Sequence, residues 1–179
     1  MSRFVIVSKY KNDNINLPSR ATKYSAGYDI EAAKDIVVPS LLNTILKNKE
    51  YLSIDIFDIE GHAAKLKNKG LKATMVPTGI KVELAPNEEL EIRSRSSLST
   101  KNLIFLANGV GTVDMDFYNN ETNEGEIHIP LVNLSPFDLF IKKGDKIAQA
   151  LIKTYRITED DVADGIRTGG FGSTNEVKD

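Results

Sequence analysis

Apolar and charged residues alternate in several short runs along the chain. Residues 80–84 read Ile-Lys-Val-Glu-Leu, and the same period of two recurs over residues 89–93 and 126–131, while residues 3–9 are rich in β-branched and aromatic side chains. Short runs of this kind, separated by Gly, Pro and Asn, predict β-strands with one buried face. Pro130, within one of these runs, predicts an edge strand or a bulge at that point. The pattern as a whole predicts an all-β fold, an antiparallel sandwich or barrel.

Residues 40–70 depart from this pattern. Ser40 is a suitable N-cap for a short helix, because the apolar residues that follow it recur at helical spacing. Asp55 is a suitable N-cap for a second amphipathic helix, which Gly70 would end. We therefore expect a small helical insertion in a β framework.

The chain has 179 residues, of which 41% are hydrophobic and 27% are charged. These values fit one globular domain over residues 1–179, with the insertion at 40–70 and a Gly-rich arm at 166–179. The formal net charge of -2 argues against a nucleic-acid binder. No apolar run approaches the ~18 residues of a membrane span. We therefore expect neither a nucleic acid nor a membrane as a partner.

The chemistry open to the chain is limited by its residue types. Cysteine is absent and His62 and His128 are the only histidines, which excludes thiol catalysis, disulfides and three-histidine metal sites. Both histidines are interpreted as surface or boundary residues, with His128 on the outward face of a strand. Carboxylates, hydroxyls, amides and cations remain, and this set suits a magnesium-bound phosphate.

The Gly-rich arm carries the strongest candidate site. Residues 167–174 read RTGGFGST, so three glycines, two hydroxyls, an arginine and an isolated Phe171 lie together. Glycine allows close backbone approach to a ligand, Arg167 offers a fork of N–H donors, and an aromatic ring can stack on a base. These features predict an arm that closes over a nucleotide, and the alternative is a flexible tail.

Two further segments offer polar groups next to a strand. Residues 93–99 (RSRSSLS) form a candidate phosphate seat, with a solvated Arg/Ser turn as the alternative. In residues 108–120 a Gly-marked turn leads into a predicted strand that places Asp114 and Asp116 on one face. Paired carboxylates can bind a cation, or one of them can activate water; the alternative is a solvated strand face.

Asp29 and Gln149 are polar residues among apolar neighbours. Asp29 follows a glycine within residues 25–30, and Gln149 lies in the apolar run of residues 142–152. Asp29 is interpreted as either a turn acceptor or a carboxylate beside a metal. A half-buried amide needs hydrogen-bond partners, so Gln149 is expected to pair with backbone or to bind a ligand.

Taken in order, these segments resemble the five motifs of the trimeric dUTPases, the dUTP diphosphatases. The matching segments are residues 17–30, 95–99, 109–117, 144–152 and 169–174. The resemblance implies a distorted jelly-roll-like β-barrel, a homotrimer with active sites shared among three chains, and hydrolysis of dUTP to dUMP and pyrophosphate with Mg²⁺. It also implies a cytoplasmic enzyme of a bacterial or phage-infected cell.

The resemblance implies a role for each matched residue. Asp114 is the catalytic base, and Asp29 contacts the metal through water. Phe117 lies under the deoxyribose and Phe171 caps the base. The substrate-binding residues that it implies are Arg95, Ser96, Ser97 and Gln149 for the phosphates, Asn108, Gly111, Thr112 and Val113 for the uracil, Phe117 for the sugar, and Arg167, Phe171, Gly172, Ser173 and Thr174 in the arm.

The chain departs from the family pattern at several positions. Ser97 replaces a glycine, Phe117 a tyrosine and Lys146 an arginine, and residues 118–124 lengthen a turn in which the family has a single residue. Arg167 also lies one residue closer to the following glycines than the family's arginine does.

Two other functions remain open from the sequence. The first is a dCTP deaminase, because the deaminases share the fold and the trimer that the resemblance implies. A deaminase needs a glutamate at the position where this chain has Pro130, and deaminases lack a Gly-rich arm of this kind. The second is a regulatory protein that binds nucleotide and acts through a protein partner at the 40–70 insertion. The alternative for that insertion is a helical cap on the side of the barrel.

Overall fold

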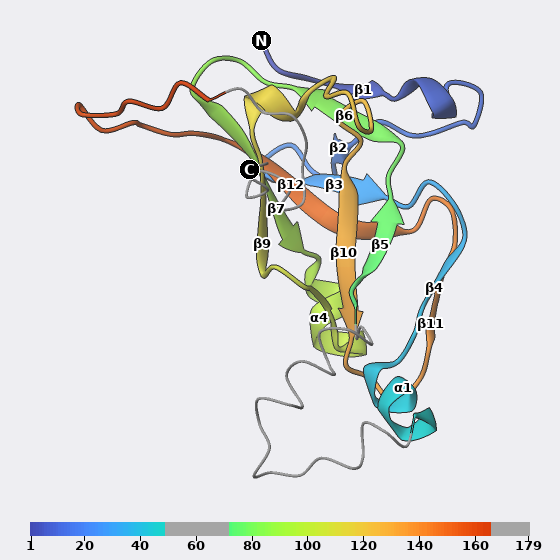
Figure 1. Ribbon diagram of the computed structural model, residues 1–179. Helices are drawn as coiled ribbons and strands as arrows, with labels where there is room; N and C mark the ends of the chain where they lie inside the picture. The colour runs from blue at the N-terminus through green and yellow to red at the C-terminus, as the bar shows by residue number, and fades with distance from the viewer. Residues whose placement is uncertain (49–71, 166–179) are drawn as a thin grey trace, which may run out of the picture.

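The computed structural model describes residues 1–48 and 72–165, and this part of the chain is built mainly from strands (Figure 1). Two short α-helices, α1 (Leu41–Lys47) and α4 (Ser96–Asn102), and two 3₁₀ turns, η1 (Ser8–Tyr10) and η2 (Met115–Phe117), complete the described elements. The strands are β1 (Arg3–Ile6), β2 (Ser19–Arg20), β3 (Tyr28–Glu31), β4 (Ile36–Val38), β5 (Thr74–Pro77), β6 (Ile80–Glu83), β7 (Glu88–Ser94), β8 (Ile104–Leu106), β9 (Val110–Val113), β10 (His128–Asn133), β11 (Leu139–Ile141) and β12 (Lys146–Thr154).

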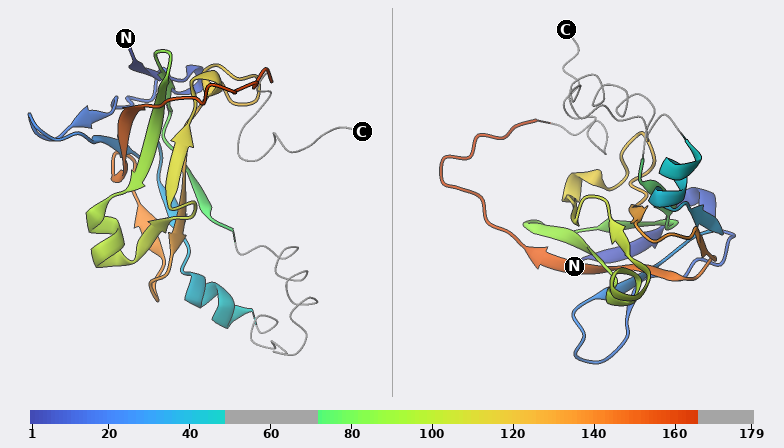
Figure 2. Two further views of the ribbon diagram at one scale, coloured as in Figure 1. Left: turned by 90° about the vertical axis from the view of Figure 1, so that its left-hand side faces the viewer. Right: turned by 90° about the horizontal axis from the view of Figure 1, so that it is seen from below.

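The strands form two main sheets and two ribbons, and the paired strands are antiparallel. The larger sheet has the order β2-β3-β12-β7-β9, and the smaller one has the order β5-β10-β8. The ribbons are β1–β6 and β4–β11. Two further views show how the sheets wrap around a common interior, with the segment after β12 leaving the body (Figure 2). The expected all-β, jelly-roll-like architecture is confirmed.

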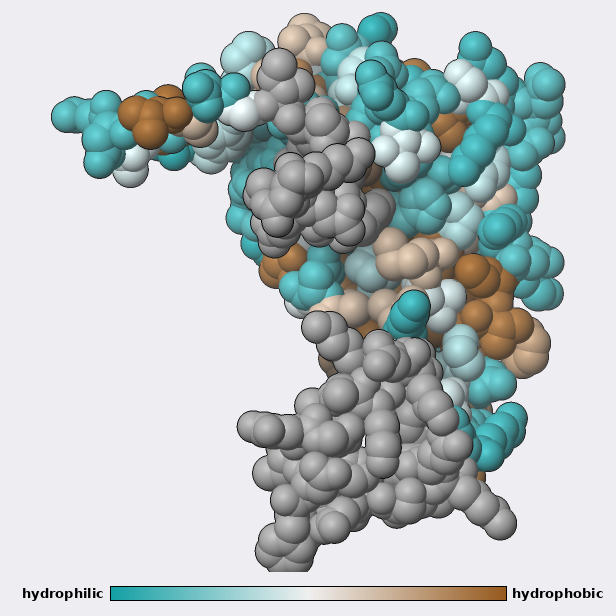
Figure 3. All heavy atoms as spheres, in the orientation of Figure 1, coloured by the Kyte–Doolittle hydropathy of each residue, from teal (hydrophilic) through white to brown (hydrophobic). Residues whose placement is uncertain are grey.

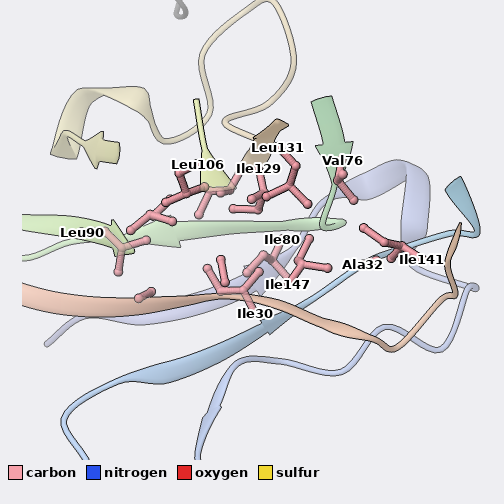
Figure 4. Packing of buried hydrophobic residues seen from close by; sticks show 14 of the residues in the cluster. Ile30, Ala32, Val76, Ile80, Leu90, Leu106, Ile129, Leu131, Ile141 and Ile147 are labelled. Carbon is pink, nitrogen blue, oxygen red and sulfur yellow. The ribbon is translucent and has the colours of Figure 1, made fainter. Parts of the chain in front are cut away.

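The core fills the space between the two main sheets. Ile30 and Leu90 on the larger sheet and Ile129 and Leu131 on the smaller sheet are fully buried, and their side chains point toward one another (Figure 4). Burial of each such side chain contributes about 1.5–3 kcal/mol to folding. Alternate residues of β7, Leu90 and Ile92, face this core, as their period-two pattern predicts, whereas β12 buries the consecutive Ile147 and Ala148.

The first helix of the insertion is confirmed. Ser40 is fully buried, and its hydroxyl accepts a hydrogen bond of 3.1 Å from the backbone N–H of Asn43, which makes it the N-cap of α1. The same hydroxyl donates to the carbonyl of Ser135 at 2.6 Å, which ties the helix to the turn after β10. The predicted second helix lies outside the described residues.

The structure corrects three local expectations. Helix α4 forms where a turn is expected, because a segment with Leu98 as its one large apolar residue carries no amphipathic signal. Strand β9 ends at Val113 and η2 follows, so Asp114 and Asp116 do not share a strand face. Pro130 lies in the middle strand of its sheet, but β8 pairs with β10 only from the next residue onward, so no β8 residue pairs with the proline.

One face of the molecule exposes apolar side chains. Over β4 and β11 hydrophobic residues gather at the surface, whereas the end that carries β1 and β6 is mainly hydrophilic (Figure 3). The exposed residues of this ribbon and the turn before it include Val37, Phe137 and Phe140.

Candidate active site

A cavity of about 210 Å³ opens beside β9 and β10. Six of the predicted site residues lie in its wall, namely Asn108, Gly111, Thr112, Val113, Asp114 and Phe117. The other lining residues are Ile92, Leu106, Ile127, His128 and Pro130. The structure therefore brings together the residues that the sequence assigns to the base, to the sugar and to water activation.

The turn before β9 brings backbone close to this cavity. Gly109 has φ +70°, and the backbone N–H of Val110 donates to the carbonyl of Asn108 at 2.8 Å, which makes a tight turn. A Cβ on Gly111 would lie 3.2 Å from the Asn108 amide nitrogen and 3.4 Å from Ile92. Glycine at this position leaves the hairpin backbone accessible to a flat ligand.

Phe117 and Asp114 are placed by the same 3₁₀ turn. The backbone N–H of Phe117 donates to the carbonyl of Asp114 at 3.1 Å, and Asp114 begins the turn in an extended conformation. The ring of Phe117 is buried, whereas Asp114 is exposed at the cavity wall. An aromatic floor thus lies beside a carboxylate that water can reach.

His128 is a cavity residue that sequence reasoning missed. It is half-buried rather than turned to solvent, and its Nε2 atom lies 3.6 Å from Oε2 of Glu126. Glu126 is fully buried, with Lys9 Nζ 2.5 Å from the same oxygen and the Gly79 N–H donating to Oε1 at 3.2 Å. A strand pattern alone cannot find this position, because the cavity forms between segments that are distant in the sequence.

A second group of predicted residues surrounds Asp29. The Lys146 ammonium donates to Asp29 Oδ2 at 2.8 Å, and the Gln149 amide donates to Oδ1 at 3.2 Å. Nε of Arg95 lies 3.5 Å from Oδ1. Burial alone raises the pKa of Asp29, but the hydrogen bonds from Lys146 and Gln149 and the charges of Lys146 and Arg95 outweigh it, so the pKa is lowered. Asp29 is therefore a carboxylate at neutral pH.

Arg95 joins this group to the start of α4. Its guanidinium donates to the hydroxyl of Ser97 at 3.2 Å, and Ser96 beside it is exposed. The Arg95 Nε atom is buried without a hydrogen-bond partner among the described residues. A buried donor without a partner and neighbouring hydroxyls are suited to an anionic ligand.

The Asp29 group and two residues of the cavity wall, Ile92 and Gly111, lie on opposite faces of the larger sheet. Gln149 pairs with Asp29 on β3 and with Arg93 on β7, whereas Ile92 and Gly111, which line the cavity, share the other face. From β3 to β9 there are three strand steps, or roughly 14 Å at ordinary spacing. Within one chain the two groups therefore do not form one pocket.

The residues predicted in the Gly-rich arm lie outside the described residues. These are Arg167, Phe171, Gly172, Ser173 and Thr174. In the described ranges 1–48 and 72–165, no helix is long and apolar enough to cross a membrane.

A jelly-roll-like β-fold with such a cavity and a separate arginine–carboxylate group is typical of enzymes that act on nucleotides. The chain belongs to the dUTPase family, whose profile matches residues 55–175. It is 34% identical over 173 residues to a deoxyuridine 5'-triphosphate nucleotidohydrolase of Lactococcus lactis, covering 96% of this chain and 95% of that protein.

Solved structures share the fold. A dUTPase from Streptococcus mutans superposes with a TM-score of 0.66 at 25% identity, over 87% of this chain and 98% of that one. A dUTPase from phage phi11 of S. aureus, described with a structural Mg(II) ion, superposes with a TM-score of 0.59 at 17% identity, over 92% and 97% of the two chains. This second similarity concerns the fold alone.

Proposed function

We propose that the chain hydrolyses dUTP to dUMP and pyrophosphate, which limits uracil incorporation into DNA and supplies dUMP for thymidylate synthesis. The oxygen of a water molecule bonds to the α-phosphorus, and the bond from this phosphorus to the oxygen bridging it to the β-phosphorus breaks. The observation that carries this function is the cavity in which a Gly-rich hairpin, an aromatic floor and the Asp114 carboxylate meet.

The hairpin supplies the recognition of uracil. Backbone groups of Gly111, Thr112 and Val113, with the amide of Asn108, face a base placed in the cavity. Cytosine presents the wrong donors and acceptors to fixed backbone groups, and thymine adds a methyl group to a narrow slot. Phe117 then lies under the deoxyribose, where a 2′-hydroxyl has no partner and no room.

Asp114 acts as the general base. An exposed carboxylate at the cavity wall accepts a hydrogen bond from water and takes its proton as the new P–O bond forms. The position at the start of η2 supports this role, because the turn holds the backbone of Asp114 relative to the Phe117 ring.

The Asp29 group binds the phosphates. Arg95, Ser96, Ser97 and Gln149 present N–H and O–H donors to them. No group of three or more His, Cys, Asp or Glu that could hold a metal lies within the described residues, and both oxygens of Asp29 already face cations. A Mg²⁺ ion would therefore be held mainly by the phosphates of dUTP, and Asp29 would contact it through water. When bound, the ion supplies positive charge that offsets charge developing on the phosphates.

The active site is shared among copies of the chain in a homotrimer. The position of the two groups on opposite faces of one sheet supports this, because a nucleotide that contacts both requires the cavity of one chain and the Asp29 group of another. Residues 167–174 of a third chain then close over the base and phosphates.

Two further proposals concern the surroundings of the enzyme. We place its activity in the cytoplasm of a bacterial or phage-infected cell. A protein partner at the 40–70 insertion is supported by the exposed Leu42 and Leu46 on α1.

A deaminase is disfavoured, because Pro130, which cannot transfer a proton, occupies the cavity wall at the position where a deaminase needs a glutamate.

Pyrophosphate release from dUTP, dCTP, dTTP and UTP in the presence of Mg²⁺ tests the proposed function. We expect release from dUTP far above the other three. Ammonia release from dCTP at a comparable rate would show a deaminase, and nucleotide binding without any turnover would show a binding protein.

A further inference from the structure

The long turn of residues 118–124 is a compact structure that directly follows Phe117 of the cavity wall. Asn120 is its centre: the side-chain amide donates to the carbonyl of Phe117 at 2.9 Å, and its oxygen accepts the backbone N–H groups of Thr122 and Asn123 at 3.0 and 3.1 Å. The turn therefore closes onto the backbone of Phe117, the residue that forms the floor of the cavity.

The end of this turn also packs against Phe117. Gly125 has φ +80°, and a Cβ there would lie 2.6 Å from the carbonyl oxygen of Phe117 and 3.0 Å from the backbone nitrogen of Asn119. Backbone in such close contact transmits a displacement, since it cannot yield as a flexible side chain does. A shift of the turn is therefore a shift of Phe117.

Lys81 on β6 joins the two ends of the turn. Its ammonium donates to the side-chain oxygen of Asn119 at 2.5 Å and to Oε1 of Glu124 at 2.5 Å, and it lies 4.9 Å from the centre of the Tyr118 ring. The Lys81 side chain is only 7% exposed. A buried ammonium needs all of its partners, so the lysine fixes the turn on the barrel.

Glu124 extends this contact to the N-terminal segment. Its carboxylate accepts the backbone N–H of Ser8 at 2.9 Å and the Ser8 hydroxyl at 3.0 Å. The turn, η2 and the β1–β6 ribbon accordingly gather at one end of the molecule (Figure 1). None of these groups lines the cavity, so they act on it indirectly, and their printed contacts to the wall lead to Phe117.

We propose that Lys81 is a positioning residue for substrate specificity, holding the turn so that Phe117 stays against the deoxyribose and excludes a 2′-hydroxyl. This inference rests on the proposed function, in which Phe117 lies under the sugar. An apolar contact that rejects an added hydroxyl is worth on the order of 10²-fold in kcat/KM. Loss of the Lys81 contacts lets the ring retreat and admits the ribonucleotide.

The test compares the dUTP/UTP ratio of kcat/KM in the wild type and in Lys81→Met. Methionine keeps the apolar stem and removes the ammonium. We expect the ratio to fall by roughly 10-fold, which is part of the discrimination that such a contact supplies. Lys153→Met is the matched control, because the Lys153 ammonium donates a 2.5 Å hydrogen bond to Glu91, and neither residue lines the cavity. The dUTP/UTP ratio of kcat/KM in this variant is expected to equal that of the wild type.

A merely structural role for Lys81 lowers stability and activity toward both substrates without changing their ratio. An unchanged ratio in a folded Lys81→Met enzyme overturns the proposal. If Lys81→Met does not fold, Glu124→Gln is used instead, because it keeps the side-chain shape and removes the charge. A fall in its dUTP/UTP ratio supports the proposal, and an unchanged ratio overturns it. If the wild type releases no pyrophosphate, the proposed function is contradicted. The positioning role of Lys81 is then tested by calorimetry, as the difference between the binding of dUMP and of UMP.

Discussion

Asp29 and Gln149 lie directly opposite each other in the antiparallel pair of β3 and β12, and the Gln149 amide donates a 3.2 Å hydrogen bond to the Asp29 carboxylate. Cross-strand neighbours of this kind have side chains close together without any rearrangement. Lys146 and Arg95 complete the surroundings of the same carboxylate. The group that we propose binds the phosphates is therefore assembled by residues of one chain.

Replacement of the proposed base tests the chemistry. Asp114→Asn keeps the hydrogen bond to water but cannot accept its proton, so we expect turnover to fall by roughly 10²–10⁴-fold. Steady-state pyrophosphate release measures the change, and calorimetry with a non-hydrolysable dUTP analogue checks that binding remains. Asp116→Asn, at an exposed neighbour that does not line the cavity, is the control and should keep most of the activity. Near-normal turnover of Asp114→Asn would exclude it as the base.

Removal of residues 167–179 tests the Gly-rich arm. We expect kcat/KM to fall at least about 10-fold, because each charged hydrogen bond lost to the phosphates is worth about 1.5–3 kcal/mol. The trimer and the β-rich circular dichroism spectrum should be retained, because the segment has little apolar surface. Gel filtration and the pyrophosphate assay measure the two effects. Dissociation of the trimer would show that the segment has a structural role instead.

The stability of the fold should depend on Glu124 and on pH. The hydrogen bond from Lys81, with those from Ser8, lowers the pKa of Glu124 from 4.5 to about 2. A carboxylate whose pKa is lower in the folded state stabilises the fold above its unfolded pKa, and this contribution is lost as pH falls from about 5 to about 2. The free energy of unfolding of Glu124→Gln should therefore lie below the wild-type value at pH 7, with the difference shrinking toward pH 2. Urea denaturation across this range measures it, and a difference independent of pH would contradict the assignment.

Ser40 should matter for stability and not for catalysis. Ser40→Ala removes the N-cap of α1 and leaves the Ser135 carbonyl without its hydroxyl donor, so we expect a loss of about 1–2 kcal/mol. Thermal and urea denaturation measure the loss, while kcat/KM for dUTP should stay near the wild-type value. Ser40→Thr, which keeps a hydroxyl, is the control. A large fall in kcat/KM in a stable Ser40→Ala protein would place α1 near the substrate.

Alternation predicted the strands within residues 80–84, 89–93 and 126–131, although Lys81, on the expected polar face, is buried. Leu90 and Ile92 face the core as their spacing requires. Ser40, which was predicted to be an N-cap, is the N-cap of α1. Helix α4 was missed, because Ser and Thr residues disfavour a helix in isolation and tertiary context overrides this preference. The presence of His128 in the cavity depends on which distant segments lie beside β10, which no local pattern contains.

The hydrogen-bond partners of the candidate residues could not be predicted from the sequence. Asp29 and Gln149 were each singled out as polar residues that need partners, but their pairing follows from the register of two strands 120 positions apart in the chain. The motifs predict which residues bind the substrate. The register shows which of them share a face.

The placement of the two groups on opposite faces of one sheet has a genetic consequence. Under the shared-site proposal, a chain damaged at Asp114 still carries an intact Arg95 group, and a chain damaged at Arg95 still carries an intact cavity. When two such alleles are expressed in one cell, their chains would form mixed trimers. Some sites in these trimers would combine an intact cavity from one chain with an intact Arg95 group from another. Such alleles would complement each other, whereas two alleles damaged in the same group would not.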